Sequence, residues 1–270
     1  QRQMCIRDRF NTDNPNNVDI FVNRDPRLYE TMVVNRNNLV EQYQGLSSTE
    51  MWQGGNVDQT FNPAVTDNPW STRMKLFKYL RDNGYAAYYP TNFAYLRMAD
   101  IHLCYAEALA QTGNLQKACD EMNKVRARVG LGKVEAMNPE LNLTANKDNF
   151  IEQLLKERAC EFGYEDSRWY DLIRYKRSDI FKKQVHQLRV WRKDANGNKM
   201  NPADYNGNTS LEPGEPWPNC IYEKIPCTNN IRVWWDTDDQ TSKWTDKWYL
   251  TPISRDEINK GYGLNQNPGW

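Results

Sequence analysis

Histidine is scarce in this chain of 270 residues, and the common motifs of cofactor chemistry are missing. The two histidines, His102 and His186, lie far apart, and no two cysteines have the CxxC spacing, so the sequence predicts no zinc site. A phosphate-binding glycine loop, a GxGxxG fingerprint and a GxSxG motif are also missing. Nucleotide-dependent enzymes and nucleophile-elbow hydrolases therefore have no support, and we expect no cofactor and no metal.

The chain also lacks a net charge and a long apolar segment. Its 35 basic and 35 acidic side chains balance. Because phosphate neutralisation supplies most of the affinity for nucleic acid, we expect no nucleic-acid partner. No apolar run reaches about 18 residues, which predicts no membrane-spanning helix. The start, QRQMCIRDRF, has no apolar signal segment and resembles translated sequencing-adaptor read-through. We therefore treat residues 1–10 as a non-native leader and expect the natural N-terminus to be missing.

Aromatic side chains are abundant, with ten Trp and fifteen Tyr. Residues 11–92 are rich in Asn, Gly and Pro, which predicts long ligand-region loops with one short strand over 28–34. Aromatic rings pack against the C–H faces of sugars, and nearby amides and carboxylates bind their hydroxyls. The candidate ligand-binding residues are Tyr43, Trp52, Asn56 and Trp70. For Trp52, packing in a core is an equal alternative.

Residues 93–178 have helical periodicity. Two sets of apolar residues recur at helical spacing around Leu103 and around Tyr105, which predicts a helix with a neighbour on each side. Gly113 separates it from a second helix over 115–130, as in the helical hairpins of tetratricopeptide repeats. We expect another helix from Phe150 to Phe162, a turn at GYED, and a shorter helix capped by Ser167.

Residues 179–270 are expected to form hairpins, loops and a C-terminal motif. The pair at 196–197 is Asn-Gly, which predicts a tight hairpin turn, and Ser254 with Glu257 predicts a capped short helix. Two further possibilities stay open. Cys220 and Cys227 would form a disulfide only if their segment folds into a hairpin. The acids Asp236, Asp238 and Asp239 would bind calcium or form a solvated loop.

The stretch ERACEFGYEDSRWYDL, residues 157–172, raises the question of catalysis. Glu157 and Glu161 share one helix face, and a glycosidase needs two carboxylates that flank a sugar. However, arginine beside a carboxylate lowers its pKa, which opposes the role of general acid. We therefore expect no catalytic residue here, and a structural network instead. Its predicted members are Glu157, Arg158, Glu161, Arg168, Trp169 and Asp171.

Several segments together resemble one family. They are NRDPRLYETMV, YLRMADIHLCYAEALAQTGN, KERACEFGYEDSRWYDLIRYKR and the ending LTPISRDEINKGYGLNQNPGW. In this order they resemble the SusD/RagB family over nearly the whole chain from Phe21 to Trp270. The ER..EF..E..RWYDL stretch and NQNPGW are the most specific. One departure is Asp166, where the family usually has glycine.

The resemblance implies a cell-surface, lipid-anchored protein of the outer membrane that captures oligosaccharides, or in some members peptides. It would bind a SusC-like TonB-dependent transporter without catalysing a reaction. It also implies a mainly α fold, with a tetratricopeptide-like scaffold, long irregular loops and small β-hairpins. Because family members are longer and carry the lipid on their N-terminal part, we expect this chain to be a C-terminal portion. An apolar face would then be exposed where further helices belong.

We therefore expect residues 11–270 to form one domain of this type. A peptide-binding member of the family is the main alternative. A tetratricopeptide adaptor is disfavoured by the long aromatic loops, which a pure helical solenoid does not need. A glycoside hydrolase is the remaining alternative, and release of reducing ends from a polysaccharide would reveal it.

Overall fold

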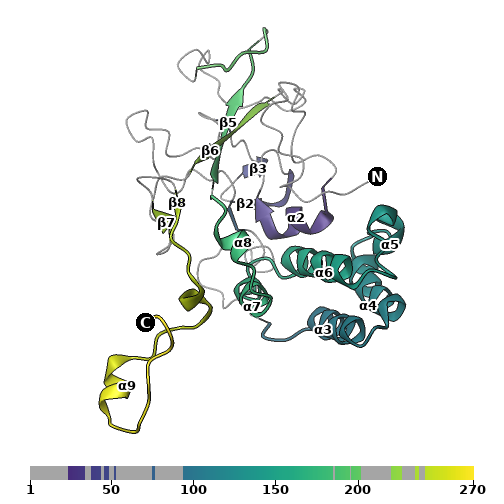
Figure 1. Cartoon of the computed structure of the whole chain (residues 1–270). Helices are drawn as coiled ribbons and strands as arrows, with labels where there is room; N and C mark the ends of the chain where they lie inside the picture. Colours follow the sequence, from purple (N-terminus) through teal and green to yellow (C-terminus); the bar gives the residue numbers. More distant parts are fainter. Residues whose placement is uncertain are drawn as a thin grey trace. The chain divides into compact units, whose positions relative to one another are not determined.

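The fold is seen in a computed structural model of the whole chain (Figure 1). The structure describes residues 24–33, 38–43, 46–48, 52, 75–76, 94–184, 186–194, 196–201, 220–226, 235–236 and 241–270. The chain divides into two compact units. Unit 1 comprises residues 1–167 and 187–225, and unit 2 comprises residues 168–186 and 226–270. The single domain expected over residues 11–270 stays a prediction.

Helices dominate the described part, and the strands form only two-stranded sheets, so the expected mainly α fold with small β-hairpins is confirmed. The helices are α2 (Pro26–Thr31), α3 (Met98–Gln111), α4 (Leu115–Arg128), α5 (Val134–Met137), α6 (Lys147–Glu161), α7 (Arg168–Arg174), α8 (Ser178–Phe181) and α9 (Arg255–Asn259), with 3₁₀ turns η2 (Pro139–Leu141) and η4 (Asp246–Tyr249). The paired strands are β1 (Met32–Val33) with β4 (Lys75–Leu76), β2 (Asn38–Tyr43) with β3 (Leu46–Ser48), β5 (His186–Arg192) with β6 (Cys220–Pro226), and β7 (Trp235–Asp236) with β8 (Thr241–Ser242).

The helical layer of unit 1 is built by α3, α4 and α6, which lie side by side in Figure 1. Gly113, with φ of 85°, ends the first helix in the left-handed region that glycine adopts without strain. The Asn114 amide then donates to the Leu109 carbonyl at 2.8 Å. The predicted helical hairpin is thereby confirmed. The wholly buried side chains of this three-helix layer include Leu103, Ala106, Ala110, Cys119, Met122, Phe150 and Leu154.

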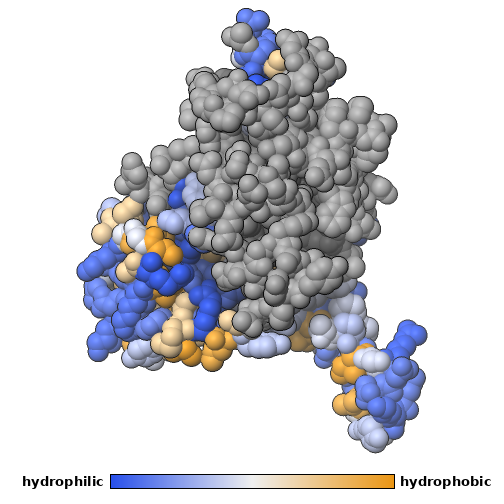
Figure 2. Space-filling view, turned by 180° about the vertical axis from the view of Figure 1, so that it is seen from behind, coloured by the Kyte–Doolittle hydropathy of each residue, from blue (hydrophilic) through white to orange (hydrophobic). Residues whose placement is uncertain are grey.

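The second apolar face of α3 has no covering element within the described residues. Tyr95, Met98 and Tyr105 are 94%, 65% and 53% exposed. Leu96 and Ile101 are exposed beside them. Figure 2 shows hydrophobic surface along the lower edge of the helical part. The expected exposed apolar face is therefore confirmed, although among the described elements the helix has neighbours on one side only.

The expected strand over 28–34 is wrong for most of its length, because α2 occupies residues 26–31. Asp25 caps this helix by accepting a hydrogen bond from the Arg27 amide at 3.0 Å. Pro26 occupies the first turn, where its fixed φ suits a helix and its missing N–H costs nothing. Local capping therefore outweighs the β-forming composition, and only Met32–Val33 pair as a strand.

Two residues of the GYED turn after α6 adopt a left-handed backbone although neither is glycine. Tyr164 and Asp166 have φ of 63° and 59°, and the Glu165 amide donates to the Phe162 carbonyl at 3.0 Å. Asp166 thus adopts the conformation that glycine reaches freely. The predicted Ser167 cap is wrong, since its buried Oγ finds no hydrogen-bond partner among the described residues.

The other sequence-predicted turns are present. Gly197 has φ of 85°, and Asp194 Oδ1 accepts from the amides of Asn196 and Asn198, which confirms the hairpin turn. In unit 2, Ser254 caps α9 by accepting from the Asp256 amide at 3.3 Å. The core of that unit is aromatic. It contains Leu172, Phe181 and Trp244, with Trp169, Ile173, Ile180, Trp248 and Tyr249 packed against them.

Candidate functional site

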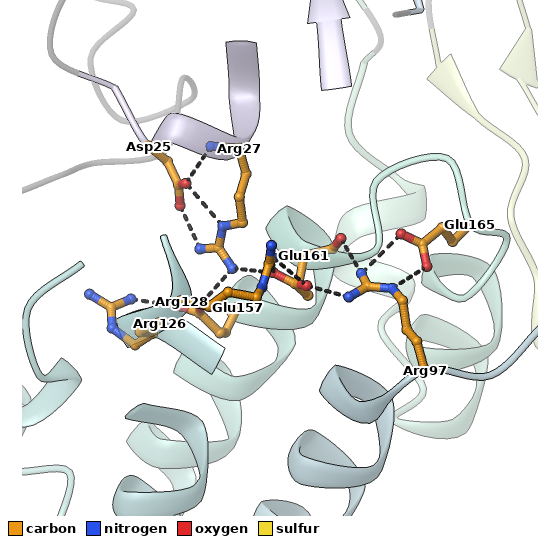
Figure 3. A network of polar contacts seen from close by, with 8 residues as sticks. All are labelled: Asp25, Arg27, Arg97, Arg126, Arg128, Glu157, Glu161 and Glu165. Atoms are coloured by element: carbon orange, nitrogen blue, oxygen red, sulfur yellow. Dashed lines mark hydrogen bonds and ion pairs between the residues drawn. The ribbon is translucent and has the colours of Figure 1, made fainter. Parts of the chain in front are cut away.

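The two glutamates of α6 that raised the question of catalysis lie in a buried ion-pair network (Figure 3). Glu157 and Glu161 are each only 3% exposed. Their spacing of four residues places them on one face of the helix. Figure 3 shows arginines from α2, α4 and the segment before α3 converging on this face.

Glu161 is the more heavily bonded of the two. Arg27 Nη1 donates to its Oε2 at 3.0 Å. Arg128 Nη2 donates to both carboxylate oxygens, at 2.9 and 3.0 Å. Arg97 Nη1 donates to Oε1, and Arg97 Nη2 reaches the Glu161 carbonyl oxygen at 2.8 Å. A carboxylate with three arginine partners has no free edge to offer a substrate.

Glu157 is held by two arginines. Arg126 Nη1 donates to its Oε2 at 2.7 Å, and Arg27 Nη1 lies 2.7 Å from its Oε1. Arg27 therefore bridges both glutamates, while its Nε donates to Asp25 Oδ1 at 2.9 Å. The network thus ties α2 to α6 and to the end of α4. These segments are far apart in sequence.

The charges set the chemistry of the network. Burial alone would raise the pKa of Glu161, but hydrogen bonds from Arg97 and Arg27 outweigh it, so this pKa lies below its usual value. Burial lowers the pKa of Arg27, but Asp25 and Glu157 outweigh that effect and the pKa is raised. A carboxyl group that stays ionised cannot donate the proton that a glycosidic leaving group needs. The arrangement supports the structural role and opposes the catalytic one.

Sequence reasoning missed the arginines that pair with these glutamates. It expected neighbouring arginines, yet Arg158 pairs with Asp100 at 3.1 Å and lies 5.0 Å from the centroid of the Phe162 ring. The actual partners are Arg27, Arg97, Arg126 and Arg128. One signal was available: Arg126 lies on the inward face of α4 and is 7% exposed, and a buried arginine requires an acid.

The remaining predicted network members lie in unit 2. Asp171 is 2% exposed and pairs with Arg174 at 3.2 Å. Trp169 packs with its ring centroid 5.1 Å from that of Phe181 and 6.3 Å from that of Trp244. Arg168 is the first residue of α7 and is half-buried. These positions support the structural role proposed for them.

The candidate ligand-binding tryptophan, Trp52, is wholly buried. It belongs to a cluster with Val190, Cys220 and Tyr222, and the Arg192 guanidinium lies 5.7 Å from its ring centroid. An indole enclosed in this way offers no face to a sugar, which favours the packing alternative. Tyr43 ends β2, but its side chain, like the whole of Asn56 and Trp70, lies outside the described residues.

No cluster of three or more His, Cys, Asp or Glu suited to a metal occurs in the described part of the chain. Of the calcium candidates, Asp236 lies on β7, whereas Asp238 and Asp239 lie outside that part. His102 Nδ1 lies 2.8 Å from Glu121 Oε2, between α3 and α4. The Cys220 side chain is buried, and its possible partner Cys227 is outside the described residues.

Comparison with known proteins agrees with this architecture. The SusD family matches residues 6–270. The chain belongs to the SusD family. Among the described helices of this SusD-family chain, none is long and apolar enough to cross a membrane.

Curated relatives match only part of the chain. A SusD-like protein of Bacteroides ovatus is 32% identical over 114 residues, which covers 39% of this chain and 18% of that protein. SusD-like protein P38 of Formosa agariphila is 32% identical over 102 residues, covering 37% and 20%. The matched segment thus spans about a fifth of each relative.

Solved structures share the fold over a longer stretch. A SusD-like protein from Bacteroides fragilis NCTC 9343 matches with a TM-score of 0.63 and 24% identity, over 93% of this chain and 40% of that chain. A second solved chain matches with a TM-score of 0.59 and 19% identity, over 93% and 37%. At these identities the likeness concerns the fold alone.

Proposed function

We propose that this protein is a non-catalytic, cell-surface capture protein that binds oligosaccharides and delivers them to a SusC-like TonB-dependent transporter. The observation that carries the proposal is the SusD family match over residues 6–270, which suggests a nutrient-binding role. A lipid anchor would hold the protein at the extracellular face of the outer membrane.

The chemistry of the buried network supports the non-catalytic part of the proposal. A retaining or inverting glycosidase needs one protonated carboxyl group beside an open sugar site. Glu161 is instead kept ionised by Arg97 and Arg27 and is closed off from solvent. The glycoside hydrolase alternative therefore has no support from the acids that first suggested it.

Ligand contacts are proposed for the aromatic and amide positions of residues 11–92, namely Tyr43, Asn56 and Trp70. Trp52 is proposed to support that region from within, since the side chain is buried against β5 and β6. Peptide capture by the same fold is the alternative, because polar loops with aromatic residues bind either ligand class.

The test is calorimetric titration of the 270-residue chain with a panel of neutral and acidic polysaccharides, alongside an assay for new reducing ends. We expect binding to a glycan without release of reducing ends, and weaker binding by Trp70→Ala. The matched control is Tyr262→Ala, since Tyr262 is 78% exposed in unit 2. Binding to peptides and to no glycan would favour the alternative, and release of reducing ends would refute the non-catalytic proposal.

A further inference from the structure

A groove in unit 2 lies outside the region where sequence reasoning placed the ligand. It has a volume of about 640 Å³, within the range of ligand sites in proteins. Its lining combines residues of η4 and of the segments on either side of it with two residues near the C-terminus. The lining residues are Lys243, Thr245, Asp246, Lys247, Trp248, Leu250, Pro268 and Gly269.

Hydrogen bonds hold the walls of this groove together. Trp270 Nε1 donates to the carbonyl oxygens of Lys247 and Leu250, at 2.9 and 3.1 Å. Gln266 bonds both the amide and the carbonyl of Ile253, each at 2.8 Å. The chain end thereby returns to η4, as seen in Figure 1. The groove is preformed, which reduces the entropy lost when a ligand binds.

A lysine held by aromatic rings lines the groove. Lys247 Nζ lies 4.6 Å from the centroid of the Trp270 ring and 5.3 Å from that of Trp248. The two rings pack edge to face, with centroids 4.9 Å apart. No carboxylate within the described residues forms an ion pair with Lys247. Rings orient an ammonium group without neutralising its charge, so this cation remains able to bind an anion.

The remaining lining suits a sugar that carries such an anion. Lys243 and Lys247 give the lining two positive charges against the single negative charge of Asp246. Trp248, Leu250 and Pro268 supply apolar surface for the C–H face of a ring. Thr245 adds a hydroxyl that can donate to, or accept from, a sugar hydroxyl.

We propose that this groove binds an acidic sugar residue, with its carboxylate on Lys247 and its ring against the Trp248 side. The inference rests on the proposed capture of oligosaccharides and names a ligand class and a second contact region for it. It predicts a preference for uronate-containing glycans over neutral ones of the same shape.

The experiment titrates the 270-residue chain with trigalacturonate and with its fully methyl-esterified form, which has the same rings without the charge. We expect the acid to bind about tenfold more tightly than the ester, since a charge-assisted hydrogen bond is lost in the ester. Raising the salt concentration should weaken binding of the acid only.

Variants locate the site. Lys247→Met keeps the unbranched stem that packs against Gly269 and removes the charge, so it should weaken acid binding about tenfold. Leu250→Glu should also weaken it, and because Leu250 is 50% exposed, this change should not disturb folding. The control is Lys260→Met on α9, whose lysine pairs with Glu257 at 2.6 Å.

The outcomes separate this inference from the proposed function. Three results would refute acid binding in the groove while leaving glycan capture intact. They are equal binding of the acid by wild type and Lys247→Met, an equal loss of binding in Lys260→Met, and equal affinity for acid and ester. The same holds if only neutral glycans of the panel bind. If no glycan binds at all, both proposals fail.

Discussion

Replacing Glu161 with glutamine tests whether the buried network stabilises the fold. The change keeps the shape of the side chain and removes its charge, so the arginines around it lose their shared anion. Removing one partner of a buried ion pair costs about 3–5 kcal/mol of unfolding free energy. We expect a cost at the lower end of this range for Glu161→Gln. Arg27 is only 6% exposed in its side chain but keeps Asp25 and Glu157, whereas Arg128 is 58% exposed and can be hydrated instead.

Urea denaturation followed by circular dichroism measures this cost. With a slope of about 2 kcal/mol per molar urea, a loss of about 3 kcal/mol lowers the midpoint of the unit 1 transition by about 1.5 M. The control Glu257→Gln removes an acid from a half-exposed pair with Lys260 and should cost less than about 1 kcal/mol. Equal midpoints for the two variants would refute the structural role of Glu161.

A second comparison uses two arginines that contact the same carboxylate. Arg27 is buried and bridges two glutamates, whereas Arg128 is largely exposed and contacts only Glu161. Arg27→Met should therefore lower the urea midpoint clearly more than Arg128→Met, because it leaves two buried glutamates short of a partner. A larger effect from Arg128→Met would show that burial does not govern the energetics of the network.

Four further predictions concern other parts of the chain. Glu161 and Glu223 have pKa values below their ordinary range. Their contribution to the stability of the fold is therefore present above about pH 4 and is lost as pH falls through the folded-state pKa values. Urea midpoints measured from pH 6 to pH 3 should fall, and constant midpoints would contradict this. Tyr105→Ser on the exposed face of α3 should change the unfolding free energy of this chain by less than about 0.5 kcal/mol, and a larger loss in urea denaturation would show that the face is covered. Asp166→Gly should stabilise the chain by up to about 1 kcal/mol by relieving the left-handed backbone, and thermal unfolding would detect a lower midpoint if the reasoning fails. Phe181→Ala should lower the unfolding free energy by about 3–5 kcal/mol, since the centroid of its ring lies 4.1 Å from that of Trp244. Near-ultraviolet circular dichroism should lose signal from the aromatic core of unit 2, and an unchanged spectrum would contradict the position of Phe181 in that core.

The sequence predicted those features that are local. The helix around Leu103 and the turn at Gly113 depend on residues a few positions apart, and both are present. The strand expected around Leu28 is wrong because the Asp25 cap and Pro26 start a helix. Weighing the cap against β propensity would have corrected the prediction.

The sequence did not predict which side chains from distant segments of the chain pair with each other. The acids of the motif were identified as structural, but Arg27 and Arg97 lie 134 and 64 residues from Glu161 in the chain, and no periodicity relates them. The burial of Trp52 has the same cause. It is enclosed by Val190 and Tyr222, which follow it by more than a hundred residues. The residues that come directly after it, Gln53 to Asn56, instead suggested an exposed loop.

The different partners of Arg27 and Lys247 bear on where this protein can bind a ligand. Arg27 forms ion pairs with two buried glutamates, so its guanidinium holds segments of unit 1 together and is not available to a ligand. Lys247 lies against two rings and, among the described residues, forms no ion pair, and it lines a groove open to solvent. Charged motifs that are prominent in sequence can thus be internal to the fold, whereas a cation that packs against aromatic rings retains the capacity to select an anionic ligand. If the Lys247→Met variant binds the acidic probe unchanged, that distinction does not predict the ligand site of this protein.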